Sequence, residues 1–279
     1  MKKISRRSFL AAAGLSVAAL ALTACGGSSA STASSVASSA ASSEAASTSA
    51  AAGELTTVEA GKLTMATNAA FPPYEMTTDA GEFEGIDVDT AKATAEKLGL
   101  ELQIDDMDFD AALLSVQQGK ADIVMAGVTV TDERKAVMDF SDSYATGIQS
   151  IIVPEGSDIA SPDDLAGKKI GTQRGTTGYI YCSDDFGDEN VVAYDDGLTA
   201  VQALNNGQVD AVVIDNAPAQ EFVAANPGLV ILDTSYAEED YAIGMAKGSS
   251  LEDAVNAALK ELKADGTLQS IVDKYITAE

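Results

Sequence analysis

Histidine is absent from all 279 residues of this chain, and cysteine occurs only twice. The absence of histidine excludes histidine-dependent catalytic triads and removes the commonest protein ligand of transition metals. Cys25 lies near the N-terminus and Cys182 far along the chain, so no disulfide framework is expected. We interpret Cys182 as a small buried hydrophobic residue. These absences argue against hydrolases of the usual kinds, and we expect no metal ion, no cofactor and no enzymatic activity.

Basic residues are scarce: 17 Lys and Arg stand against 43 Asp and Glu, which gives a net charge of −26. A chain of this charge has no electrostatic attraction to nucleic acid or to anionic lipid. We therefore expect no nucleic-acid partner, and membrane contact would need another kind of anchor. A well-solvated surface explains the acidity equally well, so the charge does not identify a ligand.

Long hydrophobic runs are also missing. The apolar stretch 9–24 follows a basic start and is too short to cross a bilayer comfortably, so we expect residues 1–24 to be a signal peptide. Within it, Ser5-Arg6-Arg7-Ser8-Phe9-Leu10 resembles a twin-arginine export signal, although Ala11 stands where that pattern often has lysine. A general secretory signal also begins with basic residues, so both export routes stay open.

The signal peptide ends in Leu22-Thr23-Ala24-Cys25, which resembles the lipobox of bacterial lipoproteins. There the cysteine is lipidated and becomes the first residue of the mature chain. The alternative is a stray cysteine after an apolar run. Residues 25–56 are expected to form a flexible linker, because 26–53 consist almost wholly of Ser, Ala, Thr and Gly. We expect an extracytoplasmic protein, periplasmic or on the outer face of the cytoplasmic membrane, held there by lipid alone.

Beyond the linker, short β-type runs alternate with helical patterns, which is typical of α/β proteins with mainly parallel sheets. Strands are expected at 62–67, 101–104, 122–126, 169–172, 191–194, 211–215 and 229–232, and helices at 88–98, 110–118, 198–205 and 217–225. A further helix carries its apolar residues on one face: Leu251, Val255, Ala258 and Leu262. Ser249 with Glu252 predicts a capping box at its start, and Gly266 predicts its end.

One sequence pattern occurs twice. Residues 116–124 (VQQGKADIV) recur in outline at 203–212 (ALNNGQVDAV), each predicting a helix end, a glycine stop and a strand that begins at aspartate. Two lobes of similar build would explain the repeat, and chance repetition of a common turn is the alternative. Because ligands in open α/β sheets bind beyond the carboxyl ends of the strands, we expect a site at 127–129 and 215–216.

A free amino acid would need two opposite charges in such a site, because unpaired buried charges are very costly. Arginine suits the carboxylate, since its planar fork makes two parallel hydrogen bonds. Only Arg134 and Arg174 follow the signal peptide. Arg134 lies shortly after the first candidate segment and is preferred, whereas Arg174 lies in a Gly- and Thr-rich loop and is expected to be exposed.

Four segments in order carry a family resemblance: 71–74 (FPPY), 83–89 (FEGIDVD), 127–135 (GVTVTDERK) with 138–141 (MDFS), and 171–178 (GTQRGTTG). From about Leu63 to Ile276 the chain resembles the polar amino-acid-binding proteins among the extracytoplasmic solute-binding proteins, family 3. The resemblance implies a two-lobed, type II periplasmic-binding-protein-like fold, each lobe a mainly parallel sheet flanked by helices, with the ligand cleft between the lobes. Lobe 1 would comprise 57–146 and 239–279, and lobe 2 would comprise 147–238.

The resemblance also implies roles for individual residues. Arg134 and the N–H of Thr129 would hold the ligand carboxylate, which the N–H of Thr177 would reach from lobe 2. The Gly127 carbonyl, the Thr129 hydroxyl and Asp215 would receive the ammonium, and two phenylalanines would form aromatic walls. The full set of expected ligand-binding residues is Phe71, Phe109, Gly127, Thr129, Arg134, Gln173, Thr176, Thr177 and Asp215.

Several of these residues also have a plainer interpretation. Thr129 and Asp215 could be strand-end caps, Phe109 a core aromatic, and 175–178 a simple turn before a helix. Departures from the family pattern at Asn68 and Gln173 leave the contacts to the ligand side chain open, and a third, at Thr90, lies outside the site. The sequence does not identify the amino acid.

Three function classes follow. The leading hypothesis is a monomeric binding protein that captures an amino acid and delivers it to the permease and ATPase subunits of an ABC importer, with the lobes closing on the ligand. The runner-up is an enzyme similar to cyclohexadienyl dehydratase, which uses the same fold but would need a further acid or base in the cleft. A stimulus-sensing module is not expected, because no transmembrane or signalling segment follows Glu279 in the sequence.

Overall fold

The structure is a computed structural model that describes residues 55–276. The predicted signal peptide, Cys25 and nearly all of the predicted linker lie outside the described residues, so those interpretations stay predictions. None of the helices in residues 55–276 combines the length and the apolar character that crossing a bilayer requires.

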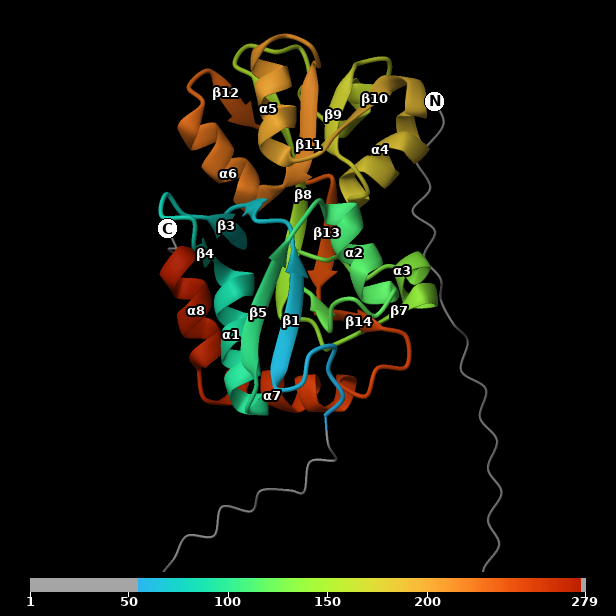
Figure 1. The fold of residues 1–279 in the computed structure, drawn as a ribbon. Coiled ribbons are helices and arrows are strands. Elements are labelled where there is room, and N and C mark those ends of the chain that lie inside the picture. Colours follow the sequence, from blue (N-terminus) through green and yellow to red (C-terminus); the bar gives the residue numbers. More distant parts are fainter. Residues whose placement is uncertain (1–54, 277–279) are drawn as a thin grey trace, which may run out of the picture. The chain divides into compact units, whose positions relative to one another are not determined.

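Lobe 1 is built on a five-stranded sheet of order β5-β1-β6-β14-β7 (Figure 1). Its strands are β1 (Lys62–Thr67), β5 (Glu101–Asp106), β6 (Ile123–Val124), β7 (Met138–Phe140) and β14 (Gly244–Ala246). Its helices are α1 (Ile86–Leu98), α2 (Phe109–Gln117), α3 (Asp132–Val137), α7 (Glu252–Ala264) and α8 (Thr267–Tyr275). A small antiparallel sheet precedes α1 and consists of β2 (Ala70–Phe71), β3 (Glu75–Thr77) and β4 (Phe83–Glu84).

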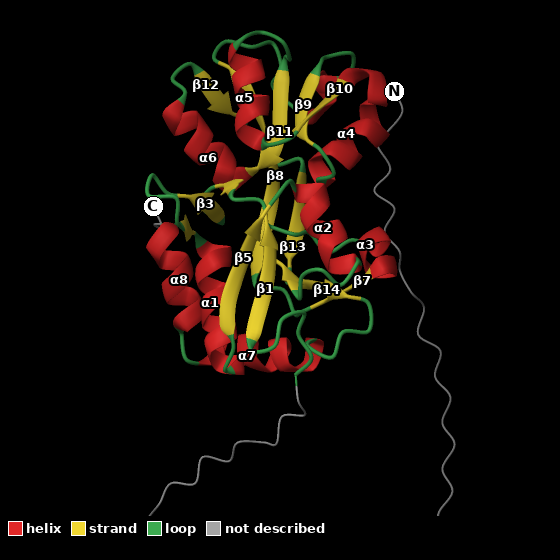
Figure 2. Cartoon of the chain, in the orientation of Figure 1, coloured by secondary structure: helices red, strands yellow, loops and turns green. Residues whose placement is uncertain are grey.

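Lobe 2 is built on a sheet of order β10-β9-β11-β8-β12, with β13 also paired to β8. Its strands are β8 (Ala145–Pro154), β9 (Ile170–Gln173), β10 (Val191–Tyr194), β11 (Ala211–Asp215), β12 (Leu229–Ile231) and β13 (Ala237–Tyr241). Its helices are α4 (Thr177–Phe186), α5 (Gly197–Asn205) and α6 (Asn216–Ala225), with short 3₁₀ turns at Pro162–Leu165 and Asp188–Asn190. In both lobes helices flank the strands (Figure 2).

The two-lobed α/β prediction is confirmed, but the sheets are mixed rather than mainly parallel. In lobe 1, β1 runs parallel to β5 and β6, whereas β14 is antiparallel to β6 and β7. In lobe 2, β9 runs parallel to β10 and β11, whereas β8 is antiparallel to β11, β12 and β13. The antiparallel part arises because the chain crosses between the lobes and then returns, so each sheet receives strands of both directions.

Two strands carry the chain between the lobes, and they pair with each other. The register joins Gly147 of β8 to Glu239 of β13, and both predicted lobe boundaries fall at this pair. Glycine is needed at position 147, because a Cβ atom there would lie 2.7 Å from Asp215 Oδ2. The C-terminal end of β13 then joins lobe 1, where Val130 donates its N–H to the Asp240 carbonyl at 3.0 Å.

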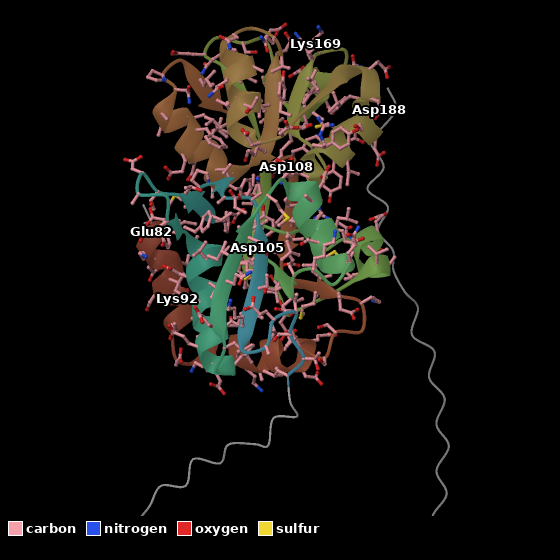
Figure 3. All side chains as sticks on the ribbon, viewed as in Figure 1. Glu82, Lys92, Asp105, Asp108, Lys169 and Asp188 are labelled. Carbon is pink, nitrogen blue, oxygen red and sulfur yellow. The ribbon has the colours of Figure 1, made fainter. Side chains whose placement is uncertain are left out.

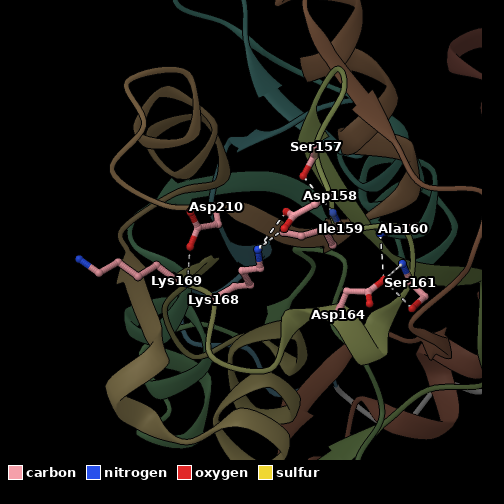
Figure 4. Close-up of polar contacts among 9 residues, drawn as sticks. All are labelled: Ser157, Asp158, Ile159, Ala160, Ser161, Asp164, Lys168, Lys169 and Asp210. Carbon is pink, nitrogen blue, oxygen red and sulfur yellow. Dashed lines mark hydrogen bonds and ion pairs between the residues drawn. The ribbon is translucent and has the colours of Figure 1, made fainter.

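The repeated sequence pattern forms equivalent structures in the two lobes. Gly119 and Gly207 both end a helix with positive φ, of 65° and 67°. In lobe 1, Asp122 donates its N–H to the Thr64 carbonyl at 2.9 Å and accepts the Thr64 N–H on Oδ2 at 2.8 Å. In lobe 2, Asp210 donates its N–H to the Lys169 carbonyl at 2.7 Å. Its Oδ2 accepts the Lys169 N–H at 2.8 Å (Figure 4). The aspartate thus fixes the start of one strand beside its parallel neighbour.

The C-terminal helices cover lobe 1. Val255, Leu259 and Leu262 of α7 lie in one core cluster with Ala91 and Ala95 of α1. The predicted apolar face of α7 is therefore confirmed. The cluster is buried because the two helices turn these faces toward each other, with α8 beside α1 (Figure 1).

The predicted capping box of α7 is wrong. Leu251 is its N-cap residue and makes no side-chain cap, while Ser249 accepts the Leu251 N–H two residues on. A side chain that closes this tight turn cannot also reach the first turn of the helix. The chain does turn at Gly266, where φ is 80°, after the helix has ended at Ala264.

Apolar and charged residues separate between core and surface. Cys182 is fully buried beside Ile170 and Val213, as predicted, and burial raises the pKa of its thiol to about 12. Charged side chains such as Glu82, Lys92 and Asp188 project from the surface (Figure 3). Among residues 55–276 the only buried acidic side chains are Glu75, Asp87, Asp122, Asp215 and Glu239, and the other acidic residues have solvent contact.

Candidate functional site

A cavity lies between the lobes at the carboxyl ends of β6 and β11, and all nine predicted binding residues line it. Lobe 1 contributes Phe71, Phe109, Gly127, Thr129 and Arg134, and lobe 2 contributes Gln173, Thr176, Thr177 and Asp215. The structure therefore brings together residues separated by up to 144 positions in the chain. The cavity wall also includes residues outside that set: Asn68, Glu75, Ala126, Gln149, Val213, Ile214 and Tyr241.

Arg134 supplies a buried positive charge from α3. Its Nη1 donates to the Thr129 carbonyl at 2.8 Å, and its Nη2 donates to the Gly175 carbonyl of lobe 2 at 3.1 Å. The guanidinium carbon lies 5.4 Å from the centroid of the Phe109 ring. Although Arg134 is only 8 % exposed, it forms no ion pair with any carboxylate of residues 55–276. Burial lowers the pKa of Arg134, and the nearby Glu239 carboxylate opposes that effect.

Asp215 supplies the opposite charge from the end of β11. Its Oδ2 accepts the Ile148 N–H at 2.7 Å, and its Oδ1 accepts the Ala217 N–H at 3.1 Å, which caps α6. The residue is 2 % exposed, and burial raises its pKa from 3.8 to about 6, against the effect of hydrogen bonds from Tyr241, Ala217 and Ile148. Asp215 is therefore both a helix cap and a cavity carboxylate.

Two threonine hydroxyls meet across the cleft. Thr129 lies beyond β6 in lobe 1, and Thr177 begins α4 in lobe 2, with their Oγ1 atoms 3.4 Å apart. Both hydroxyls donate to Oε2 of Glu239, at 3.1 and 2.9 Å. Gln149 donates to the same oxygen at 3.0 Å. Glu239 therefore connects the two lobes directly behind the cavity wall.

Aromatic rings close one side of the cavity. Phe71 stacks on Tyr74 with ring centroids 5.8 Å apart, and Tyr74 meets Tyr241 edge-on at 5.4 Å. Phe71 also packs against Gly127, where a Cβ atom would lie 2.8 Å from the ring. Gly127 has φ of 55°, which disfavours a side chain there. The close approach of ring and backbone therefore requires glycine at this position.

Gln173 and Thr176 line the cavity but already have polar partners. Gln173 donates to Oδ1 of Asn68 at 2.8 Å, which joins the lobes at the two positions that depart from the family pattern. The Thr176 hydroxyl donates to the Gln173 carbonyl at 2.8 Å and caps α4 by accepting the Tyr179 N–H. Arg174 is exposed and lies 3.5 Å from Asp195, as expected for a surface charge.

A buried pair of carboxyl groups supports the lobe 1 wall. Asp87 Oδ2 accepts the Gly127 N–H at 3.0 Å and thereby holds the backbone whose carbonyl is expected to face an ammonium. Glu75 lies beside Asp87, and both residues are fully buried. Burial raises the pKa of Asp87 to about 6 and that of Glu75 well above its ordinary value. The pair is therefore expected to hold a proton.

Sequence reasoning missed Glu239, Gln149 and Tyr241. All three lie on the crossing strands β8 and β13, neither of which was predicted. Local sequence gave little signal, because β13 reads Ala-Glu-Glu-Asp-Tyr and acidic residues are depleted in strands. The alternation within β13 is visible only in the structure, where Glu239 and Tyr241 are buried and Glu238 and Asp240 are exposed.

Comparison with known proteins places this geometry in a family. The model of the bacterial extracellular solute-binding proteins, family 3, matches residues 63–278. A probable histidine-binding protein of Neisseria gonorrhoeae is 33% identical, covering 96% of this chain and 95% of its own length. An arginine-binding extracellular protein of Bacillus subtilis is 34% identical, covering 78% and 87%.

Solved structures agree with these relatives. The arginine-, lysine-, histidine-binding protein of Geobacillus stearothermophilus superposes with a TM-score of 0.75 at 35% identity, over 78% of this chain and 96% of that one. An ancestral arginine-binding protein bound to glutamine gives 0.75 at 41% identity, over 78% and 99%. The chain belongs to the bacterial extracellular solute-binding proteins, family 3.

Proposed function

We propose that this protein captures a free amino acid between its lobes and delivers it to an ABC importer. The observation that carries the proposal is the pair of buried, opposite charges facing one cavity from different lobes. Arg134 has no carboxylate partner among residues 55–276, and Asp215 is held by N–H groups and a tyrosine rather than by a cation. Relatives of this chain include proteins named as cystine-, arginine- and glutamine-binding and one named as a probable histidine-binding protein.

A zwitterion satisfies both charges at once. Its carboxylate would accept hydrogen bonds from Arg134 and from the N–H groups of Thr129 and Thr177, and its ammonium would donate to Asp215. Each buried charge is costly alone, and pairing with the ligand offsets that cost. Because the two charges come from different lobes, the ligand stabilises the closed arrangement over an open one, and hinge closure follows.

In this proposal, the N-terminal segment determines where in the cell the protein is held. A lipid on Cys25 would hold the protein at the cell membrane outside the cytoplasm, and the linker would let the binding lobes reach the importer. Linkers rich in Ser, Ala and Gly behave as flexible coils, so they permit such movement. The monomer would present its ligand to the permease, while the ATPase subunits drive uptake.

A thermal-shift screen against the twenty common amino acids tests capture. A ligand that binds the folded state raises the melting temperature in proportion to the logarithm of its concentration over Kd. We expect at least one amino acid to raise it and calorimetry to show one molecule bound per chain. If none of the twenty shifts the melting temperature at millimolar concentration, the proposal fails.

The same sample separates binding from catalysis. A binding protein releases its amino acid chemically unchanged after denaturation, whereas a cyclohexadienyl dehydratase-like enzyme would convert a cyclohexadienyl acid. We expect mass spectrometry to recover the bound amino acid intact and to detect no turnover of arogenate or prephenate. Turnover of either compound would select the enzyme.

A further inference from the structure

Glu239 is a buried carboxyl group placed where the crossing strand β13 passes behind the cavity. It is 6 % exposed and does not line the cavity itself. Its Oε2 takes three donors: the hydroxyls of Thr129 and Thr177 and the side-chain amide of Gln149, all within 3.1 Å. Its Oε1 is buried with no partner among residues 55–276. All three donors belong to residues that line the cavity, and two of them are threonine hydroxyls.

The arrangement decides which way each hydroxyl points. A threonine hydroxyl has one proton to donate and two lone pairs that can accept, and a carboxylate only accepts. When Glu239 takes the proton of Thr129 and the proton of Thr177, neither hydroxyl has a donor left. Each threonine oxygen can then only accept a hydrogen bond from a ligand in the cavity, through a lone pair.

We propose that Glu239 is a positioning residue that sets both threonine hydroxyls as hydrogen-bond acceptors and so makes the site selective for the ammonium of its ligand. The inference rests on the proposed function, because it concerns the ammonium half of the amino-acid site. An ammonium has three donors and no acceptor, so it complements oxygens fixed in this way. An anionic group, or a group without a hydrogen-bond donor, would face only lone pairs in the same place and would be disfavoured.

The position of Glu239 in the fold strengthens this role. Thr129 belongs to lobe 1 and Thr177 to lobe 2, and one oxygen atom of Glu239 serves both. Glu239 lies opposite Gly147 at the point where the two crossing strands pair. One of these two bonds must cross between the lobes, so the pair of fixed acceptors is complete only when the lobes are together and forms in the same step as closure.

The test compares an amino acid with its analogue that lacks the ammonium. The probes are L-arginine with 5-guanidinopentanoate, L-glutamine with glutaramate, and L-histidine with 3-(imidazol-4-yl)propanoate. The variant is Glu239→Gln, which keeps the shape but gives the side chain donors of its own. The matched control is Glu238→Gln, which makes the same charge change on the neighbouring, exposed residue of the same strand.

Calorimetry should show that Glu239→Gln loses affinity for the amino acid but not for its analogue without the ammonium. We expect Glu239→Gln to raise the Kd of the amino acid about tenfold or more, the scale of one hydrogen bond to a charged group. The Kd of the ammonium-free analogue should change by less than about threefold, because that molecule does not use the acceptor polarity. Glu238→Gln should leave both values as in the wild type.

Other results overturn the inference. If Glu239→Gln loses the same affinity for the amino acid and for its analogue, the role of Glu239 is purely structural. If it loses affinity for neither, Glu239 has no role in binding. If the wild type binds none of the twenty amino acids, both the proposed function and the positioning role are rejected. If the wild type binds an amino acid and Glu239→Gln binds it equally well, only the positioning role is rejected. If Glu239→Gln does not fold, Glu239→Asp carries the test: its shorter carboxylate should give the same selective loss in smaller measure, and equal losses would contradict the account.

Discussion

At Arg134 a positive charge is buried against two carbonyl oxygens and the face of an aromatic ring. Carbonyl dipoles and a ring compensate a guanidinium only in part, because neither carries a full negative charge. An incoming carboxylate would complete the compensation with two parallel hydrogen bonds. The energetics of the residue therefore favour an anionic group in the cavity.

Replacing Arg134 by alanine should remove most amino-acid binding. We expect Arg134→Ala to cost about 2 kcal/mol or more of binding free energy, since it leaves the ligand carboxylate buried without its partner. Arg174→Ala is the matched control, because Arg174 is exposed and lies outside the cavity. Isothermal titration calorimetry measures both variants, and near-normal affinity in Arg134→Ala would refute the assigned role.

Asp215 should make the affinity depend on pH. Its pKa in the unliganded protein is about 6, and a bound ammonium favours the charged form, so binding lowers that pKa and releases a proton. Affinity should be full above pH 6 and fall below it, by about tenfold between pH 7.5 and pH 5. The buried Asp87 titrates in the same range, so the comparison needs Asp215→Asn, which should bind weakly with a flatter profile. An affinity that stays level or rises toward pH 5 in the wild type would contradict the role of Asp215.

At the scale of elements, one aspartate at the start of a strand recurs in each lobe. Asp122 is the more buried of the two and accepts the N–H groups of Val58 and Thr64 at 2.7 and 2.8 Å. Asp122→Ala should lower the free energy of unfolding by about 1–3 kcal/mol, because a buried N–H loses its acceptor. Urea denaturation measures the change, with Asp79→Ala in an exposed turn as the control. Equal stability of the two variants would show that the strand start does not depend on this carboxylate.

Local patterns predicted those elements whose residues decide their own structure. The strand at Ala211–Asp215 and the helix at Gly197–Asn205 were anticipated within one residue, because β-branched runs and helical periodicity are local properties. The short β6 was predicted as 122–126, but it pairs with β1 and β14 only over Ile123–Val124. The crossing strands escaped prediction because β13 is polar and is stabilised by pairing with a segment some ninety residues away.

The residues of the site also differ in whether they could be predicted from local sequence. All nine residues carried over from family motifs meet in one cavity, since the motifs follow strand ends that the fold brings together. Glu239 and Tyr241 could not be found in this way, because their relation to the cavity depends on the register of β13 against β8. Gln173 and Thr176 line the cavity, but the sequence could not show that their side chains bond to Asn68 and to α4.

For the whole molecule, Cys25 is predicted to decide location. Cys25→Ser should move the protein from the membrane fraction to the soluble fraction, because none of the helices in residues 55–276 could take over as a membrane span. Removing a lipid with two or more acyl chains abolishes stable anchoring. Cys182→Ser is the control, since that thiol is buried in lobe 2. Unchanged membrane fractionation of Cys25→Ser would reject the lipid anchor.

Binding of an amino acid between Arg134 and Asp215 is tested most directly by a crystal structure of the protein with the amino acid that gives the largest thermal shift. We predict one molecule between the lobes, with its carboxylate on the Arg134 guanidinium and its ammonium within hydrogen-bond distance of Asp215 and the Thr129 hydroxyl. An amino acid bound elsewhere, or bound between the lobes with its two charged groups reversed, would contradict this prediction.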